Sequence, residues 1–259
     1  MIIIIASLLL MAQGCDKTKD NTSKVIDKAR SNFISGFYVD SEKGFERYLQ
    51  DNPQGPHRLE AWKYLVKIAS EVRHDSARGA AILEAMYLEF GHNPELAATL
   101  KRELAEMYIR TGQYKIAVEA LEKSLEFQDQ PQEQLDLTRT LLAESFRSLR
   151  NYDLAIYTYS DIAKSTKNKT TKARAIFEMA HTLTLIQAWE RAESELDKLI
   201  KMTDVPVEIK AEAAFMLADI YENRHEYKRA AELLETIVDT YPNPYAVRYK
   251  LDYLQEKFD

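Results

Sequence analysis

Two apolar stripes at three- and four-residue spacing lie close together near the C-terminal end of the chain. The first predicts a helix and comprises Ala213, Ala214, Leu217, Ala218 and Tyr221. The second predicts another helix and comprises Ala230, Leu233, Leu234, Ile237 and Val238. The polar segment 222–226 predicts a turn, and Pro242 and Pro244 cannot continue the second helix. The stretch 211–244 is therefore a predicted helical hairpin, which is too small to bury its apolar faces without a stacked neighbour.

The same pattern repeats upstream at a nearly constant period. Alanines equivalent to Ala230 recur at intervals of 38, 37, 38 and 37 residues, as Ala192, Ala155, Ala117 and Ala80. Most of them follow an aromatic residue by three positions, and these aromatics are Tyr227, Trp189, Tyr152 and Tyr114. A fixed period over five units indicates a stack of equivalent hairpins rather than unrelated domains.

The period divides residues 22–259 into about six hairpins of an all-α solenoid. The predicted repeats lie near 22–59, 60–97, 98–135, 136–172, 173–210 and 211–248. A last apolar stripe within 245–258 predicts a capping helix and comprises Val247, Leu251, Leu254 and Phe258. The composition agrees with helices, because 29% of the residues are charged and only 7 are Gly and 7 are Pro.

These anchors resemble the tetratricopeptide repeat (TPR), whose consensus is W-x2-L-G-x2-Y, then A-x3-F, then P. Measured from Ala214, the chain places Leu217, Ala218, Tyr221, Ala230, Leu234 and Pro242 at the consensus positions. Ala214 replaces the Trp and Ala218 the Gly. The third repeat matches closely through Leu104, Ala105, Tyr108, Gly112, Tyr114, Ala117 and Leu121.

Some features depart from the family pattern. The period exceeds the family's 34 residues by three or four, and we expect the extra residues in the links 128–133 and 166–171. The turn of the second repeat, 73–79, is expected to be about two residues longer than the others. The first repeat is the weakest, because Lys28 and Asn32 stand at expected apolar anchors, as an outermost repeat allows.

The first residues have a different character. Residues 2–14 carry no charge and are mostly aliphatic, but thirteen residues are too few to span a bilayer. The segment 1–14 therefore predicts a secretory signal peptide. Cys15 is the only cysteine, which excludes an intramolecular disulfide.

A lone cysteine after such a segment resembles the processing site of bacterial lipoproteins. The resemblance implies that Cys15 becomes the lipidated first residue and that 15–21 is a polar tether. Ala12 stands where that pattern prefers Leu, and no basic residue precedes the apolar run. The alternatives are an ordinary cleaved signal with an incidental cysteine, or an uncleaved anchor. The lipoprotein interpretation predicts a location in the cell envelope facing the periplasm, with the outer membrane favoured over the inner.

Function in stacked hairpins usually lies on the concave surface, which the first helix of each hairpin lines. Helix positions between the packing anchors predict a partner-binding face of Lys63, Lys67, Arg102, Glu106, Glu144, Arg147, Phe177, His181, Phe215, Asp219 and Glu222. Ser70, Thr140 and Thr184 continue these rows. This face is expected to be basic toward the N-terminal end and acidic, with exposed phenylalanines, toward the C-terminal end. The alternative is that these residues form an ordinary solvated or half-packed face without a binding function.

Chemistry beyond binding finds little support. No glycine-rich phosphate loop, G-x-S-x-G motif or paired carboxylates with a base occur, so we predict no enzyme, no cofactor and no metal. The sequence at 225–229 lacks the second His of H-E-x-x-H. One residue per helix also converges poorly on a metal, which weakens a site at His181 between Glu144 and Asp219. The net charge of -6 argues against nucleic acid as the main partner.

The sequence thus favours a membrane-anchored periplasmic scaffold that binds a peptide or helix of another protein. The plan resembles the BamD-like outer-membrane lipoprotein of the barrel-assembly machinery, which implies a role in outer-membrane protein assembly as one alternative. A second alternative, of another class, is an enzyme or a small-ligand or metal binder that uses the surface around His181.

Overall fold

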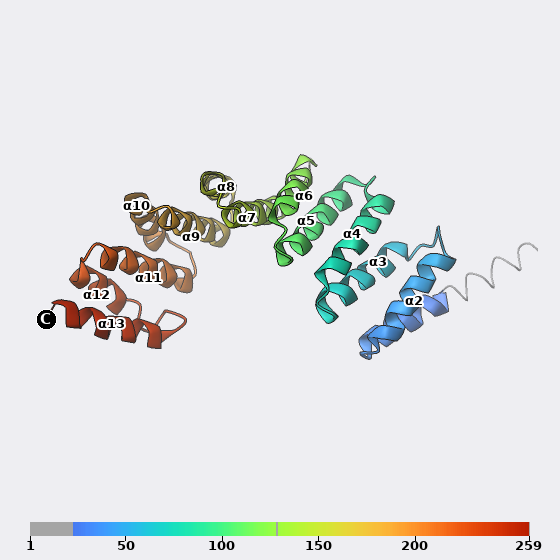
Figure 1. Cartoon of the computed structure of the whole chain (residues 1–259), viewed down its shortest axis with the longest axis horizontal. Helices are drawn as coiled ribbons and strands as arrows, with labels where there is room; N and C mark the ends of the chain where they lie inside the picture. The colour runs from blue at the N-terminus through green and yellow to red at the C-terminus, as the bar shows by residue number, and fades with distance from the viewer. Residues whose placement is uncertain (1–22, 128, 259) are drawn as a thin grey trace, which may run out of the picture. The chain divides into compact units, whose positions relative to one another are not determined.

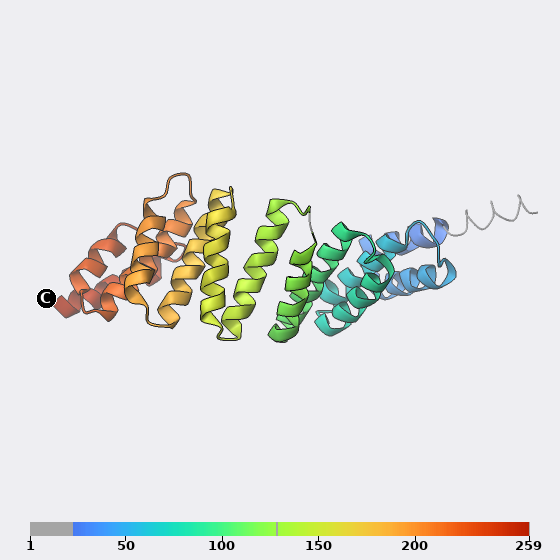
Figure 2. The ribbon, with the colours of Figure 1, turned by 90° about the horizontal axis from the view of Figure 1, so that it is seen from above.

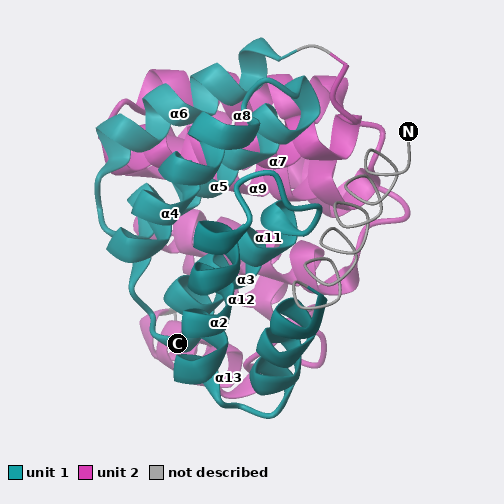
Figure 3. Cartoon of the chain, turned by 90° about the vertical axis from the view of Figure 1, so that its right-hand side faces the viewer, with its two compact units in different colours: residues 1–128 teal, residues 129–259 magenta. Residues whose placement is uncertain are grey.

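The structure is a computed structural model that describes residues 23–127 and 129–258. The described residues contain helices and turns and no strand. They fall into two compact units, unit 1 (1–128) and unit 2 (129–259), which are coloured separately in Figure 3. This confirms the predicted all-α class, and the described helices form hairpins followed by a final helix, α13 (Pro244–Phe258).

Unit 1 consists of helical pairs in which each helix packs against the next (Figure 1). Residues 23–34 form the first helix. It is followed by α2 (Tyr38–Asp51), α3 (Arg58–Lys67), the π-helical η1 (Ile68–Val72), α4 (Ser76–Phe90), α5 (Pro94–Arg110) and α6 (Tyr114–Glu126). Phe45, Tyr48 and Ile68 are fully buried in one core cluster, and Leu83 and Met86 lie in the next.

Unit 2 contains seven helices within its described residues, lying side by side in Figure 2. They are α7 (Gln132–Ser148), α8 (Tyr152–Ser165), α9 (Lys169–Leu185), α10 (Trp189–Lys201), α11 (Val207–Asn223), α12 (Tyr227–Glu235) and α13 (Pro244–Phe258). Besides its sequence neighbours, α9 contacts both α7 and α11. The first helices of successive hairpins therefore share one side of unit 2, which we call the first-helix face.

The turn inside each hairpin repeats with the same period as the alanines. A residue with positive φ stands at each turn, at Gly36, His74, Gly112, Arg150, Gln187 and His225. The following N–H donates back to a carbonyl near the end of the first helix, as Gln113 does to Tyr108 at 2.8 Å and Asn151 to Phe146 at 2.8 Å. This is the Schellman ending of a helix, which satisfies carbonyls that have no partner within the helix.

The repeating alanines pack as the pattern predicts. Ala117, Ala155, Ala192 and Ala230 are fully buried, and Ala80 is 7% exposed. An alanine leaves room for two helix backbones to approach, so a constant spacing of buried alanines stacks the hairpins in a constant way. The apolar anchors of the stretch 211–244 are likewise in the core, since Leu217, Ala218 and Leu234 are at most 2% exposed.

The links predicted to carry the extra residues are shorter than expected. α7 begins at Gln132 after Pro131, and α9 begins at Lys169, so the N-terminal turns of these helices include 132–133 and 169–171. At α9 the side chain of Asn168 accepts a hydrogen bond from the N–H of Thr171 at 3.0 Å. Such a cap stabilises an earlier helix start, so much of the added length becomes helix rather than loop.

Two other expectations about individual repeats are wrong. The turn of the second repeat is only residues 73–75, and the additional residue is accommodated as the π-helical segment Ile68–Val72. In the first repeat, Lys28 is exposed and Asn32 is half-buried. The buried positions of that helix are Ala29, which fits the repeat pattern, and Ile26, so Lys28 and Asn32 do not serve as core anchors.

The predictions for the start of the chain concern residues outside the described ones. These are the signal peptide 1–14, the lipidation of Cys15 and the tether 15–21, and they stay predictions. Among the helices that the structure describes, none is both long and apolar enough to cross a membrane.

Candidate functional site

The predicted face residues of α7 and α9 form an ion-paired cluster. Arg147 donates to a carboxylate oxygen of Glu178 at 2.5 Å, and its guanidinium lies 3.5 Å from Nδ1 of His181. Nδ1 of His181 is also 3.8 Å from the Glu178 carboxylate. Both members of the Arg147–Glu178 pair are less than a quarter exposed. The cluster therefore joins two neighbouring first helices, and Glu178, at its centre, was not among the predicted site residues.

A second cluster joins α11 to the capping helix. Lys250 forms ion pairs with Asp219 and, at 2.5 Å, with Glu222. Its ammonium also lies 5.4 Å from the ring centroid of Phe215, a cation–π contact. Asp219, Glu222 and Phe215 are thus brought together by a residue of α13 that lies outside the predicted face.

The phenylalanines are not exposed as expected. Phe177 and Phe215 are both half-buried. The ring of Phe215 stacks on Tyr241 with centroids 4.7 Å apart, and the guanidinium of Arg174 lies 5.6 Å from the ring of Phe177. Neighbouring helices and links supply partners for aromatic rings, so these side chains already have contacts in the free protein.

Burial sets the protonation of the carboxylates on this face. Burial raises the pKa of Glu144, with the Glu178 charge adding to it and Arg147 opposing it. Burial also raises the pKa of Asp219, against the hydrogen bond and charge of Lys250. For Glu178, burial is outweighed by hydrogen bonds from His181 and Arg147, so its pKa lies below the usual range. Glu144 forms no ion pair with another described residue, so its charge is the least supported of these three carboxylates.

Unit 1 brings its four predicted residues around one hollow. Lys63, Lys67, Arg102 and Glu106 all line a cavity of ≈ 420 Å³ between α3, α4 and α5. Arg102 is buried rather than solvent-facing, at 8% exposed, and its Nε and Nη1 find no hydrogen-bond acceptor among the described residues. Burial raises the pKa of Glu106, and the Arg102 charge opposes this.

A larger pocket opens between α7 and α9 on the first-helix face. We call this cavity of ≈ 690 Å³ the α7–α9 pocket. Its wall includes Leu137, which is 43% exposed, and Thr140. Other lining residues are Thr171, Arg174, Glu178 and, from α11, Ile209. Apolar and hydrogen-bonding groups therefore line one space, as is common in binding sites.

Two polar atoms beneath this pocket have no protein partner. Tyr159 of α8 is fully buried, and its hydroxyl forms no hydrogen bond with any described residue. The same holds for the side-chain oxygen of Gln134, and both residues line the α7–α9 pocket. Buried hydroxyls and amides are nearly always hydrogen-bonded, so two such atoms without a partner at one pocket are unusual. Sequence reasoning missed Tyr159 because its position in α8 marks it as a core anchor.

The metal alternative gains no geometric support. The described residues contain no group of three or more His, Cys, Asp or Glu side chains that could hold a metal ion. His181, which carried that alternative, has a guanidinium as its neighbour. A fixed cation beside the ring disfavours a second cation.

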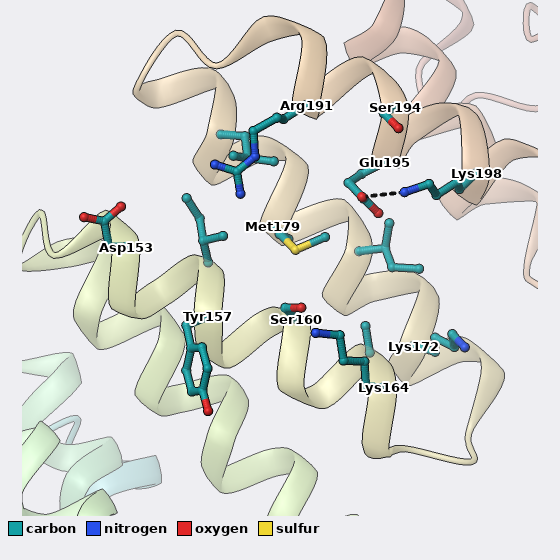
Figure 4. A pocket seen from close by; sticks show the side chains of 14 residues that line it. Asp153, Tyr157, Ser160, Lys164, Lys172, Met179, Arg191, Ser194, Glu195 and Lys198 are labelled. Atoms are coloured by element: carbon teal, nitrogen blue, oxygen red, sulfur yellow. Dashed lines mark hydrogen bonds and ion pairs between the residues drawn. The ribbon is translucent and has the colours of Figure 1, made fainter.

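A further groove lies on the opposite, second-helix side of unit 2, where no site residue was predicted. The α8–α10 groove, a cavity of ≈ 860 Å³, is lined by α8, α9 and α10 alone (Figure 4). Sequence patterns could not reveal it, because its walls are ordinary polar positions of α8 and α10 and its floor consists of apolar core positions.

Comparisons with known proteins agree with this architecture. Residues 103–131 and 212–244 each match the tetratricopeptide-repeat family. No match to the sequence was found among curated proteins. The chain therefore carries tetratricopeptide repeats in the TPR-like solenoid fold that its helices define.

Solved structures with similar folds include proteins described as having TPR or TPR-like repeats. RapI in its apo form aligns with a TM-score of 0.68 at 12% identity, covering 90% of this chain and 69% of that one. The TPR-like repeats of a putative kinesin light chain from Podosopora anserina give 0.58 at 18%, covering 78% and 98%. YrrB, a TPR protein with an unusual peptide-binding site, gives 0.54 at 16%, covering 79% and 96%. At these identities the likeness shows the fold alone.

Proposed function

We propose that this protein is a non-catalytic docking scaffold whose first-helix face in unit 2 binds a segment of another protein. TPR proteins generally mediate protein–protein interactions, which supports the class of function. The observation that carries the proposal is the α7–α9 pocket with the partnerless Tyr159 hydroxyl and Gln134 oxygen beneath it.

The pocket suits a peptide in both its apolar and its polar parts. Leu137 and Ile209 offer apolar surface for one side chain of the partner. The Tyr159 hydroxyl and the Gln134 oxygen are buried in the free molecule, so they would pair with a peptide only when the pocket opens on binding. A bound chain would thus satisfy groups that have no protein partner in the free molecule, which favours binding over an empty pocket. YrrB, with its peptide-binding site, gives a precedent within the same fold.

The predicted face residues then have two roles in this proposal. Arg147, Asp219 and Glu222 hold neighbouring helices in register, through ion pairs with the unpredicted residues Glu178 and Lys250. Phe177 borders the proposed binding surface, because Arg174 lines the pocket and its guanidinium lies over the Phe177 ring.

Photo-crosslinking in cells tests the proposal. Leu137 is replaced by benzoylphenylalanine, and the matched control carries the same substitution at Leu88, which is 87% exposed on α4 of unit 1. We expect a defined segment of a partner protein to crosslink from position 137 and not from position 88. Crosslinking of the same segment from both positions, or from position 88 alone, would contradict the pocket assignment.

We also propose that the scaffold is tethered to a bacterial membrane through lipidated Cys15 and works at the periplasmic side of the envelope. The support is the apolar segment 2–14 followed by the lone cysteine and a polar stretch. Cys15→Ser is expected to release the protein into the soluble fraction or to block its maturation. If the variant stays in the membrane fraction to the same extent as the wild type, the lipid-anchor proposal is wrong.

A finer version places the scaffold in outer-membrane β-barrel assembly, as the BamD-like plan implies. The support is the order of elements, a cysteine, a short tether and TPR hairpins. If the segment crosslinked from position 137 belongs to a component outside outer-membrane protein assembly, that version is wrong and the general scaffold remains.

A further inference from the structure

The α8–α10 groove has an apolar floor and polar walls. Its floor is formed by α9, where Ile176, Met179 and Leu183 are between 1% and 8% exposed (Figure 4). Ile156 of α8 adds to it, and Tyr157 at the rim is 72% exposed. Methionine adapts its shape to different neighbours, which suits the floor of a binding groove.

The walls carry more positive than negative groups. The cations are Lys164, Lys172, Arg191 and Lys198, and the carboxylates are Asp153 and Glu195. Within the described residues, Lys198 pairs with Glu195 at 2.7 Å, whereas no ion pair is formed by Lys164, Lys172 or Arg191. Arg191 and Lys164 flank Met179 in Figure 4, one from α10 and the other from α8.

This pattern contrasts with the other side of the same unit. On the first-helix face, Arg147, Arg174 and Lys250 each pair with a carboxylate of a neighbouring helix. The cations of the groove form no ion pairs between neighbouring helices of the described residues. The chain as a whole is acidic, with a net charge of -6. A cluster of unpaired cations on an acidic protein produces a local field that attracts negative groups.

We propose that the α8–α10 groove is a second docking site, which takes an acidic amphipathic helix of a partner protein. Apolar side chains of that helix cover Met179 and Ile156, while its carboxylates pair with Lys164 and Arg191. This is the helix-in-groove mode of recognition, with charges that set the orientation. Nucleic acid is disfavoured, because Asp153 and Glu195 stand in the walls where a phosphate backbone would pass.

A titration with synthetic peptides tests the inference. The probe is a fluorescein-labelled peptide EELIEEFLEELI, and its charge-reversed counterpart is KKLIKKFLKKLI. We expect the full chain to bind the glutamate peptide at least tenfold more tightly than the lysine peptide. The double variant Lys164→Glu with Arg191→Glu should lose at least tenfold in affinity for the glutamate peptide. The control, Lys201→Glu with Lys228→Glu, makes the same change in net charge at exposed positions outside the groove and should bind like the wild type.

Three results would overturn the inference. The first is equal affinity for the glutamate and lysine peptides, and the second is an equal loss of peptide affinity in the groove and control variants. The third is a labelled thymidine oligonucleotide that binds more tightly than the glutamate peptide and no longer binds the groove variant. Helical circular dichroism equal to the wild type shows that each variant is folded. The groove residues do not line the α7–α9 pocket, so failure here leaves the crosslinking result from position 137 unaffected.

Discussion

Removing the Tyr159 hydroxyl is expected to stabilise the free protein. The side chain is fully buried and its hydroxyl has no protein partner, whereas the ring itself fills the core. A buried hydroxyl without a hydrogen bond costs about 1–3 kcal/mol, and Tyr159→Phe removes that oxygen while it keeps the ring. Because relaxation of the neighbouring side chains recovers part of this cost, we expect a gain of about 1 kcal/mol. That corresponds to a rise in melting temperature of roughly 2–4 °C.

Tyr48→Phe is the matched control for this prediction. Tyr48 is also fully buried, but its hydroxyl accepts a hydrogen bond from the N–H of His57 at 3.1 Å. Deleting that hydroxyl leaves a donor without its partner and should cost about 1 kcal/mol. Urea unfolding followed by circular dichroism on the full chain measures both changes. Destabilisation of the Tyr159→Phe variant by as much as the Tyr48→Phe variant would refute the reasoning, because it would show that the Tyr159 hydroxyl is bonded in the free protein.

Three further predictions concern the repeats and their charges. Gly112→Ala should cost about 1 kcal/mol by thermal unfolding, because φ is +73° and a Cβ there meets no atom within 4 Å, so that only backbone strain is added; no loss would contradict the turn. Leu121→Ala removes a fully buried side chain and should lower the free energy of unfolding by about 2–5 kcal/mol. Leu88 is 87% exposed, so Leu88→Ala should change it by less than about 0.5 kcal/mol, and similar losses of stability for both variants would contradict the packing. Burial raises the pKa of Glu144 in the folded protein, so its protonation stabilises the fold. This stability is fully present below the unfolded-state pKa of about 4.3 and is lost as the pH rises through the folded-state pKa. Glu144→Gln should therefore melt higher than wild type at pH 7, with a gap that closes below about pH 4, and a constant gap across that range would contradict the assignment.

The sequence predicts the repeat well because periodic burial is a local property. Ala117, Ala155, Ala192 and Ala230 recur at a fixed spacing and are all fully buried, so the helices and their pairing follow from the pattern alone. The π-helical segment Ile68–Val72 could not be predicted in this way, since one extra residue can be absorbed by a helix or by a turn with nearly the same sequence.

The binding surfaces are harder to predict, because they depend on contacts between different helices. The spacing places Phe215 on the predicted face, but its stacking on Tyr241 requires the position of the link after α12. In the same way, Arg147 is on the expected face and is paired with Glu178 of the next first helix. The Tyr159 hydroxyl is the clearest case, since a core anchor and a pocket-lining donor have the same sequence pattern.

Binding of the segment crosslinked from position 137 tests the central claim most directly. Its dissociation constant is measured by titration calorimetry with the wild-type chain, with Leu137→Glu and with the control Leu88→Glu. A charge in the wall of the α7–α9 pocket must be desolvated when an apolar side chain docks, so we predict at least tenfold weaker binding for Leu137→Glu. The control should bind like the wild type. Equal dissociation constants for all three proteins would show that the partner binds elsewhere and would contradict the account.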